Sequence, residues 1–346
     1  GHNQGSLPTV DTTFLAEVVF NGSTCTTYID GTLQGTAFSS SGSFNINQMA
    51  VGGGAYGDNF FTGDIAEVVL YNSALSTADR QAVENYLKSK WAIGNPTDNL
   101  PVSGSSVWLD ASASNAVLNS SGAQATNGQL VATWNNLSGG ATGAVTQSSD
   151  SYRPTYVANA INGKSVLHFS GNQVLASSST YANTGSATSA FVVMRRTADT
   201  TNYARSISFI GPSSNSDYNN VGNWCLNNNS SGSTMYVERN GGHNQGALPA
   251  VNTTYLAEVI FDGSNCTTYI NGIAQGTAFS STGNFNIAQM AVGAGYGGGV
   301  TPYCPLTGDI GEVIIYNSAL STGDRQTIEN YLKSKWGISS ATDALP

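Results

Sequence analysis

Residues 307–336 read TGDIGEVIIYNSALSTGDRQTIENYLKSKW, and residues 62–91 read TGDIAEVVLYNSALSTADRQAVENYLKSKW. Each stretch opens with a run of β-branched and apolar residues and closes with a run of helical spacing. In the first stretch, Ser321 stands three residues before Asp324, a pairing that caps the start of a helix. The apolar residues that follow fall on one face of that helix: Ile328, Tyr331, Leu332 and Trp336. The sequence therefore predicts a strand followed by a terminal helix in the first stretch, and residues 76–91 repeat the helical pattern in the second.

The duplication extends beyond these two stretches. Residues 1–54 align without a gap to residues 242–295, with 40 of 54 positions identical. Residues 62–101 align in the same way to residues 307–346, with 29 of 40 positions identical. Identity this high indicates a tandem duplication with little divergence.

The stretch between the copies, residues 102–241, has no counterpart. Residues 1–101 are therefore interpreted as the back half of one repeat, and residues 102–346 as a complete repeat whose front half is residues 102–241. A back half alone leaves strand edges unpaired and an apolar face of its sheet exposed to solvent. Because every copy of the chain carries two back halves and one front half, no homo-oligomer can complete both. We expect a further front half of about 140 residues, the length of residues 102–241, upstream of Gly1 or as a separate fragment.

Composition narrows the class of protein. Only 10% of the 346 residues are charged, and the formal net charge is −9. Nucleic-acid binders need a basic surface, which this balance excludes. No run approaches the roughly 20 apolar residues of a membrane span. Few charges, abundant Ser, Thr and Asn, and sparse Cys are typical of an extracellular or cell-surface protein.

Strand signals dominate residues 102–346: short runs of β-branched and aromatic residues separated by clusters of Gly, Asn and Ser. The predicted strands are residues 107–109, 131–134, 166–169, 190–194, 206–210, 224–226, 235–237, 255–261, 266–270, 290–292 and 310–316. Many short strands with one helix predict an all-β fold, an antiparallel two-sheet sandwich with one C-terminal α-helix per repeat.

Several motifs resemble a known family. Residues 107–112 (VWLDAS), 134–139 (WNNLSG) and 153–156 (RPTY) are similar to the opening of bacterial laminin-G-like domains. Residues 308–321 (GDIGEVIIYNSALS) are similar to the closing strand and turn of those domains. They belong to the concanavalin A-like lectin/glucanase superfamily, and the resemblance implies a jelly-roll sandwich. Because this fold hosts lectins, glucanases, adhesins and spacers, it implies no single function.

The resemblance brings no catalytic motif with it. Glucanases of the superfamily place their carboxylates on one strand in a Glu-x-Asp-x-x-Glu pattern, which is missing from this sequence. The nearest pairs are Asp309 with Glu312 and Asp64 with Glu67. An offset of three residues places two side chains on opposite faces of a regular strand. We therefore expect no catalytic residues and no enzymatic activity, and we expect His168 to be a strand residue with a satisfied ring.

Calcium is the one cofactor that the resemblance suggests, because many relatives bind Ca²⁺ through Asp and carbonyl oxygens. Their closing strands often carry an acidic residue just before the Glu, where this chain has Ala66 and Gly311. Asp309 and Asp110 remain as candidate metal ligands, without a complete site around them.

Sugar binding needs aromatic rings next to hydrogen-bonding side chains. Residues 213–220 (SSNSDYNN), together with an upstream tyrosine and a downstream tryptophan, offer both in one loop region. The candidate carbohydrate-binding residues are Trp224, Tyr218, Tyr203, Asp217 and Asn219. The same composition also suits an ordinary polar loop beside a core tryptophan.

The cysteines leave their pairing open. Cys25 and Cys266 occupy equivalent positions, and Cys225 is the one cysteine of the front half. A disulfide shared by both repeats would therefore use Cys225, leaving Cys304 as an odd thiol. The spacing of the four matches no zinc site.

The sequence is consistent with two functions for this protein. The first is a non-catalytic extracellular tandem-repeat module, a structural or adhesive component of a cell-surface filament, stalk or adhesin. Its partners would be neighbouring repeats of the same polypeptide or a polymer of it. The alternative is a carbohydrate-binding, lectin-like module of a secreted polysaccharide-processing protein, with glycans as partners.

Overall fold

The computed structural model describes residues 2–10, 12–44, 46, 48–54, 59–91, 93, 100–138, 143–178, 181, 183–199, 201–212, 217–218, 222–295 and 302–339. The chain divides into two compact units, residues 1–98 (unit 1) and residues 99–343 (unit 2). Neither helix of the described chain is long and apolar enough to cross a membrane.

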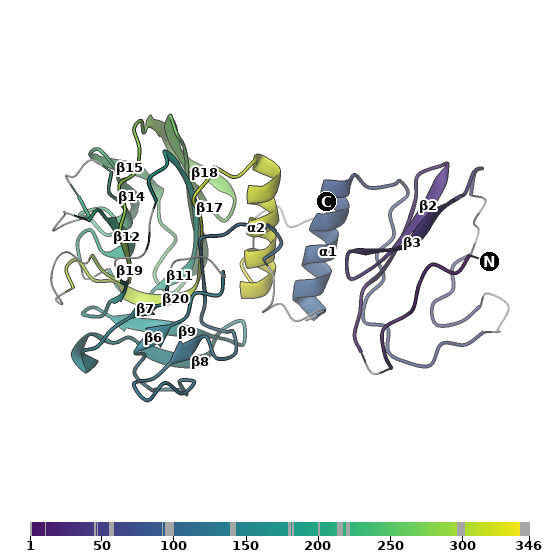
Figure 1. The fold of residues 1–346 in the computed structure, drawn as a ribbon, viewed down its shortest axis with the longest axis horizontal. Helices are drawn as coiled ribbons and strands as arrows, with labels where there is room; N and C mark the ends of the chain where they lie inside the picture. The colour runs from purple at the N-terminus through teal and green to yellow at the C-terminus, as the bar shows by residue number, and fades with distance from the viewer. Residues whose placement is uncertain are drawn as a thin grey trace. The chain divides into compact units, whose positions relative to one another are not determined.

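Unit 2 is a sandwich of two antiparallel sheets (Figure 1). The nine-stranded sheet has the order β15-β14-β13-β12-β19-β10-β7-β6-β5, and the eight-stranded sheet has the order β18-β17-β16-β11-β20-β9-β8, with β4 also paired to β20. The strands are β4 (Val107–Asp110), β5 (Val117–Leu118), β6 (Thr133–Trp134), β7 (Val145–Thr146), β8 (Thr155–Ile161), β9 (Lys164–Ser170), β10 (Leu175–Ser177), β11 (Ala187–Arg196), β12 (Arg205–Ile210), β13 (Trp224–Asn228), β14 (Thr234–Glu238), β15 (Gly242–Ala247), β16 (Thr254–Asp262), β17 (Asn265–Ile270), β18 (Ile273–Ser280), β19 (Gln289–Val292) and β20 (Thr307–Tyr316).

This architecture confirms the all-β jelly-roll prediction. Each predicted run contains a strand, and six further strands were not predicted: β5, β7, β8, β10, β15 and β18. Three of these six are only two or three residues long, too short to show a period. Strands β15 (GHNQGA) and β18 (IAQGTAFS) are polar and glycine-rich. Pairing with their neighbours, rather than propensity, makes them strands.

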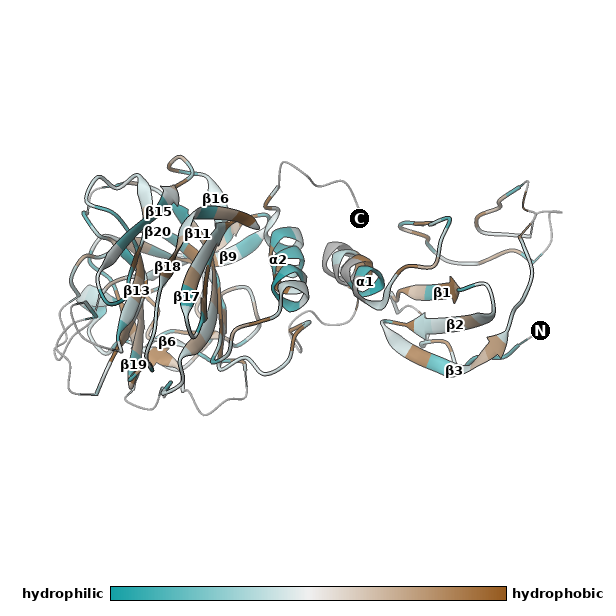
Figure 2. Ribbon diagram, turned by 90° about the horizontal axis from the view of Figure 1, so that it is seen from above, coloured by the Kyte–Doolittle hydropathy of each residue, from teal (hydrophilic) through white to brown (hydrophobic). Residues whose placement is uncertain are grey.

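Two apolar layers hold unit 2 together. One lies between the sheets, where Val313 and Ile315 of β20 point inward. The other lies between the outer face of the eight-stranded sheet and helix α2 (Thr322–Trp336), where Ile314 of the same strand packs. Alternate residues of one strand thus serve the two layers. Both views show α2 alongside the strands of this sheet (Figure 2).

The predicted cap of α2 is confirmed. The Ser321 hydroxyl accepts a hydrogen bond from the Asp324 amide at 3.1 Å, and it donates one to the Asp324 carboxylate at 2.8 Å. The helix ends at Gly337, whose left-handed backbone (φ 64°) suits glycine.

A β-bulge changes which residues of β20 share a face. Adjacent residues of β11 pair with Ile310 and Glu312, so Gly311 between them is the extra residue. Asp309 and Glu312 are therefore two register positions apart and lie on the same outer face. The prediction that they face opposite sides is wrong for this reason. Gly311 suits the position, because a Cβ there would lie 2.5 Å from the Trp336 ring.

Unit 1 holds a three-stranded sheet of β1 (Ala16–Phe20), β2 (Thr24–Ile29) and β3 (Thr32–Ser39), together with helix α1 (Thr77–Trp91). Residues 62–71, which align with β20, form no strand. In unit 2 the partners of β20 are β4, β9 and β11, all from the front half. Unit 1 has no copy of these strands in this sequence.

Apolar side chains of unit 1 are exposed where their counterparts in unit 2 are buried. Val18 is 58% exposed and its counterpart Val259 is 0% exposed. Leu70 is 77% exposed and its counterpart Ile315 is 0% exposed. Five further residues of unit 1 show the same contrast: Phe20, Met49, Val51, Ile65 and Val68. In unit 2 all seven counterparts lie in the core between the sheets, to which residues of the front half contribute.

Replacement of Trp336 by alanine should reduce the free energy of unfolding of unit 2 by about 3–5 kcal/mol, the usual cost of truncating a buried tryptophan. Trp336 is 1% exposed, and its indole donates a hydrogen bond to the Glu312 carboxylate at 2.7 Å. Trp91 is the matched control, because it makes the same bond to Glu67 but is 38% exposed. Trp91→Ala should cost about 1 kcal/mol or less. Urea unfolding followed by far-ultraviolet circular dichroism measures both losses, and equal losses would contradict the account.

Candidate functional site

The outer face of the nine-stranded sheet carries a polar cluster. Strands β12, β13 and β14 turn Ile207, Leu226 and Val237 into the core between the sheets. The residues that alternate with these side chains face outward. The register places Cys225 opposite Glu238 and Asn227 opposite Tyr236, and the pairing of Arg205 with Asn227 brings the arginine to the same group.

A buried ion pair lies at the centre of this cluster. Arg205 Nε is 3.0 Å from Asp217 Oδ2, and Nη2 is 3.1 Å from Oδ1, a bidentate arrangement. The Tyr303 hydroxyl donates to Asp217 Oδ1 at 2.7 Å and accepts from the Asp217 amide at 2.9 Å. Arg205 Nη1 also donates to the Tyr203 carbonyl at 2.7 Å. The pair thereby fixes the loop after β12 and the segment before β20.

Tyrosine rings surround the ion pair. The Arg205 guanidinium lies 5.3 Å from the Tyr303 ring centroid and 5.8 Å from that of Tyr218, within cation–π range. The Tyr218 and Tyr303 centroids are 6.3 Å apart, and the Tyr203 and Tyr236 centroids are 5.4 Å apart. Tyr218 is 40% exposed, and the other three rings are half-buried. The cluster therefore offers aromatic surface to solvent next to polar groups.

Asn227 adds an amide with unmet hydrogen-bonding capacity. The residue is 4% exposed, and neither Oδ1 nor Nδ2 has a hydrogen-bond partner among the described residues. A buried amide without a partner is costly, by roughly 1–3 kcal/mol. Such an amide is satisfied when a water or a ligand hydroxyl supplies one donor and one acceptor.

The ionisation of the cluster suits binding better than catalysis. Burial, reinforced by the negative charge of Asp217, raises the pKa of Tyr303, which keeps the hydroxyl protonated. Burial also raises the pKa of the Cys225 and Cys304 thiols, so neither is a thiolate nucleophile near neutral pH. All four cysteines are free thiols, so the disulfide that the sequence left open is not formed.

Three of the predicted carbohydrate-binding residues come together here: Asp217, Tyr218 and Tyr203. Trp224 lies on β13 but faces the core, where it is 1% exposed and stacks on Phe209 with ring centroids 4.3 Å apart. Its ring faces contact protein, so it offers no surface to a ligand. Asn219 lies outside the described residues.

Four members of the cluster were missed from the sequence: Arg205, Asn227, Tyr236 and Tyr303. In the strands WCLNN and TMYVE, residues two apart share one face of the sheet. Once the core-facing side of each strand is known, this alternation places Asn227 and Tyr236 on the outer face. No sequence signal connects Tyr303 or Arg205 to that face. Long-range folding brings them there.

The two candidate metal ligands each hold a cationic side chain. Asp309 accepts from Arg195 Nε at 2.8 Å and lies 2.7 Å from His168 Nδ1, which confirms that the His168 ring is satisfied. Asp110 lies 2.6 Å from Lys335 Nζ. Among the residues that the structure describes, no three His, Cys, Asp or Glu side chains gather as a metal site would require. Asp309 and Asp110 thus each form an ion pair with a cationic side chain, at two separate places in unit 2.

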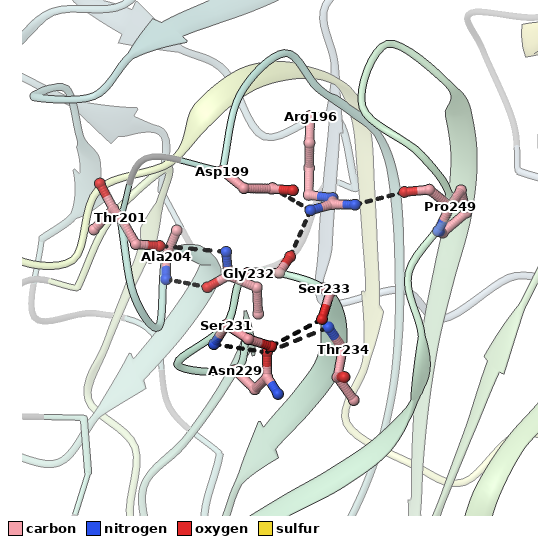
Figure 3. A network of polar contacts seen from close by, with 11 residues as sticks. Arg196, Asp199, Thr201, Ala204, Asn229, Ser231, Gly232, Ser233, Thr234 and Pro249 are labelled. Atoms are coloured by element: carbon pink, nitrogen blue, oxygen red, sulfur yellow. Dashed lines mark hydrogen bonds and ion pairs between the residues drawn. The ribbon is translucent and has the colours of Figure 1, made fainter.

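A second polar network, around Arg196, is structural. Its guanidinium donates to the carbonyls of Gly232, at 2.6 Å, and Pro249, and it pairs with Asp199 (Figure 3). Arg196 thus ties three loops together at the end of β11. The cavity beside it, between the sheets, has a volume of about 20 Å³. That volume holds about one water molecule, so this network does not form a sugar site.

A family model described as the concanavalin A-like lectin/glucanases superfamily matches residues 3–79 and 168–324. No protein of curated function matches the chain.

Three solved structures illustrate the likeness at the level of coordinates. A mutant of the NanB sialidase from Streptococcus pneumoniae is 18% identical with a TM-score of 0.33, covering 41% of this chain and 24% of the sialidase. The CBM40 module of the Ruminococcus gnavus IT-sialidase, bound to α2,3-sialyllactose, is 13% identical with a TM-score of 0.38, covering 47% and 94%. The Trypanosoma rangeli sialidase in complex with the inhibitor DANA is 13% identical with a TM-score of 0.41, covering 72% and 38%.

The chain thus spans about a quarter of the pneumococcal sialidase and less than half of the trypanosomal one. The family match carries the assignment, because its two segments together cover more than half of the chain. The chain therefore belongs to the concanavalin A-like lectin/glucanase superfamily.

Proposed function

We propose that unit 2 is a non-catalytic carbohydrate-binding module of an extracellular or cell-surface protein, and that it binds a glycan over the cluster on the nine-stranded sheet. The observation that carries this proposal is the solvent-exposed ring of Tyr218 beside the Arg205–Asp217 pair and the unpartnered Asn227 amide.

The chemistry of a sugar fits this arrangement. A pyranose presents an apolar C–H face that packs on an aromatic ring, and hydroxyls that both donate and accept. Tyr218 offers the ring, and the buried Asn227 amide has hydrogen-bonding capacity that no described residue uses and that a ligand would reach through a bridging water. Because Arg205 and Asp217 hold each other in place, their positions are set before the ligand arrives, which lowers the entropy cost of binding.

The charge of the site favours a neutral glycan. The Arg205 guanidinium is neutralised by Asp217, and Glu238 lies on the same face. The chain as a whole carries a net charge of −9. An acidic sugar would therefore meet no free cation in the described cluster.

The absence of an enzymatic activity is part of the proposal. Asp309 and Glu312 share a face, but Glu312 is buried beneath Trp336 and Asp309 is bound to Arg195. Neither carboxylate is free to act as a general acid or nucleophile on an external bond.

The test is a glycan array probed with the intact chain and three variants. Tyr218→Ala and Asn227→Ala should each weaken binding to the same neutral glycans by about tenfold, since lost stacking or hydrogen bonding is worth about 1 kcal/mol. Tyr152→Ala, which removes a half-buried tyrosine outside the cluster, should leave binding unchanged. Thermal unfolding checks that the variants remain folded. No reproducible binding, or equal binding by Tyr218→Ala and the parent chain, would contradict the proposal.

We also propose that the chain is part of a tandem array of such sandwiches, with a structural or adhesive role at the cell surface. The exposed apolar side chains of unit 1 support this reading, because front-half residues cover their counterparts in unit 2. A second front half beside unit 1 would form a second sandwich of the same kind.

This second proposal is tested by a fusion that places an extra copy of residues 102–241 directly before Gly1. The junction reproduces the native one, because Gly1 aligns with Gly242. Residues 1–101 should then resist proteolysis as strongly as residues 242–346, and binding of an apolar dye should fall. The same fusion with Val192→Asp in the added copy is the control, because Val192 lies in the core between the sheets. If residues 1–101 stay as protease-sensitive in the fusion as in the parent chain, the array proposal fails.

A further inference from the structure

A lysine lies buried between two carboxylates beneath helix α2. Lys335 Nζ is 2.6 Å from Asp110 Oδ2 and 2.8 Å from Glu312 Oε2. Asp110 is the last residue of β4, Glu312 lies in the middle of β20, and Lys335 is in the last turn of the helix. The side chains of all three are at least nine-tenths buried. An amine and a carboxyl group are therefore held in contact, away from water.

Aromatic side chains enclose the group and orient Glu312. Its Oε1 accepts from the Trp108 indole at 2.8 Å, and its Oε2 accepts from the Trp336 indole at 2.7 Å. The Tyr331 hydroxyl lies 3.3 Å from Glu312 Oε1 and 3.1 Å from Lys335 Nζ. These hydrogen bonds hold the Glu312 carboxyl group in a fixed position beside the lysine, as a reaction between neighbouring groups requires.

The pKa values of Glu312 and Lys335 are both raised by their surroundings. Burial raises the pKa of Glu312, and the neighbouring Asp110 carboxylate raises it further, while Lys335 acts in the opposite direction. The two carboxylates raise the pKa of Lys335 despite its burial. The raised pKa of Lys335 favours its ammonium form, so a neutral amine arises only when a proton passes to a carboxylate in contact with it. As an ion pair alone, such a buried cluster adds little stability over apolar packing.

We propose that Lys335 and Asp110 react to form an intramolecular isopeptide bond, and that Glu312 serves as the proton carrier for this single-turnover step. The geometry that carries the proposal is the contact of one amine with two differently held carboxyl groups in a dry, aromatic enclosure.

The reaction is a condensation that needs no other reactant. A proton first passes from Lys335 Nζ to Asp110 along their hydrogen bond, which leaves a neutral amine and a neutral carboxyl group. The Nζ lone pair attacks Asp110 Cγ and forms the C–N bond. Glu312 takes the proton released from Nζ and then passes that proton to the departing hydroxyl. The C–O bond breaks, one water leaves, and Glu312 ends as it began.

Two physical effects favour this condensation in place of the stable ion pair found in water. Burial by itself favours the neutral, nucleophilic amine of Lys335, against the two carboxylates that raise its pKa. Fixed contact also replaces an encounter in solution, and effective molarities of about 10⁵–10⁸ M are reached by well-oriented groups.

The bond would change how unit 2 responds to force. Asp110 lies in the first strand of the unit and Lys335 in its terminal helix, 225 residues apart. A covalent link between them carries a pulling force past the sandwich, so the strands between are not unfolded. This consequence suits a surface array, but the proposed reaction depends neither on the array nor on glycan binding.

Unit 1 provides an internal comparison. Lys90 and Glu67 align with Lys335 and Glu312, but Asp110 lies in the front half, which has no second copy. The chain should therefore form one such bond and not two. The front-half fusion described above supplies a second aspartate and should form two.

The test is the mass of the intact, folded chain measured under denaturing conditions. We expect it to be one water, about 18 Da, below the sequence mass. Trypsin should release residues 91–164 and residues 334–346 as one branched peptide, because Lys335 is no longer a cleavage site. The branched peptide is decisive, since a succinimide at Asp30-Gly31 or Asp262-Gly263 would lose the same mass without a cross-link.

Variants separate the roles of the three residues. Lys335→Arg should have its full sequence mass, and Glu312→Gln should form the bond at least about tenfold more slowly, because proton transfer of this kind contributes at least that much. Asp110→Asn should still react but lose ammonia, about 17 Da, in place of water. A parent chain of full sequence mass, or one that releases residues 91–164 unbranched and residues 336–346 as a separate peptide, overturns the proposal whatever the variants do.

Discussion

Strand β20 exists because the front half supplies its partners. It pairs with β4, β9 and β11, and its two faces are buried by the core between the sheets and by α2. Residues 62–71 differ from residues 307–316 at only 3 of 10 positions and form no strand in unit 1. Local sequence is nearly the same in both places, so long-range pairing makes the difference. The core between the sheets and the burial of α2 against the outer face of β20 depend on this pairing.

Several charged residues of unit 2 pair with one another across the closed sandwich. Arg205 with Asp217, Arg195 with Asp309, and Lys335 with Asp110 each join segments that are far apart in sequence. A chain with only 10% charged residues has little charge left for a general electrostatic surface. The proposed recognition of a glycan therefore rests on the tyrosine rings, amide and hydroxyls of the cluster on the nine-stranded sheet. Such pairs fix the positions of their side chains, which both the proposed ligand binding and the proposed reaction require.

The sequence predicted the elements that have strong local patterns, but not how those elements pack in the folded chain. Alternation and capping predicted eleven strands and the helix start at Ser321. Alternation alone does not say which face of WCLNN is the core, so Trp224 was predicted as a ligand platform and is a core residue. The bulge at Gly311 reversed the faces expected for Asp309 and Glu312. Part of the candidate site was predicted because Asp217 and Tyr218 are adjacent, whereas Tyr303 joins them only in the folded chain.

The central claim, that the front half and not local sequence makes β20 a strand, is tested by hydrogen–deuterium exchange of the intact chain. Residues 62–71 and 307–316 serve as near-identical reporters in one molecule. The account predicts slow amide exchange across residues 307–316 and exchange close to that of an unstructured peptide across residues 62–71. Equal protection of the two stretches would contradict it.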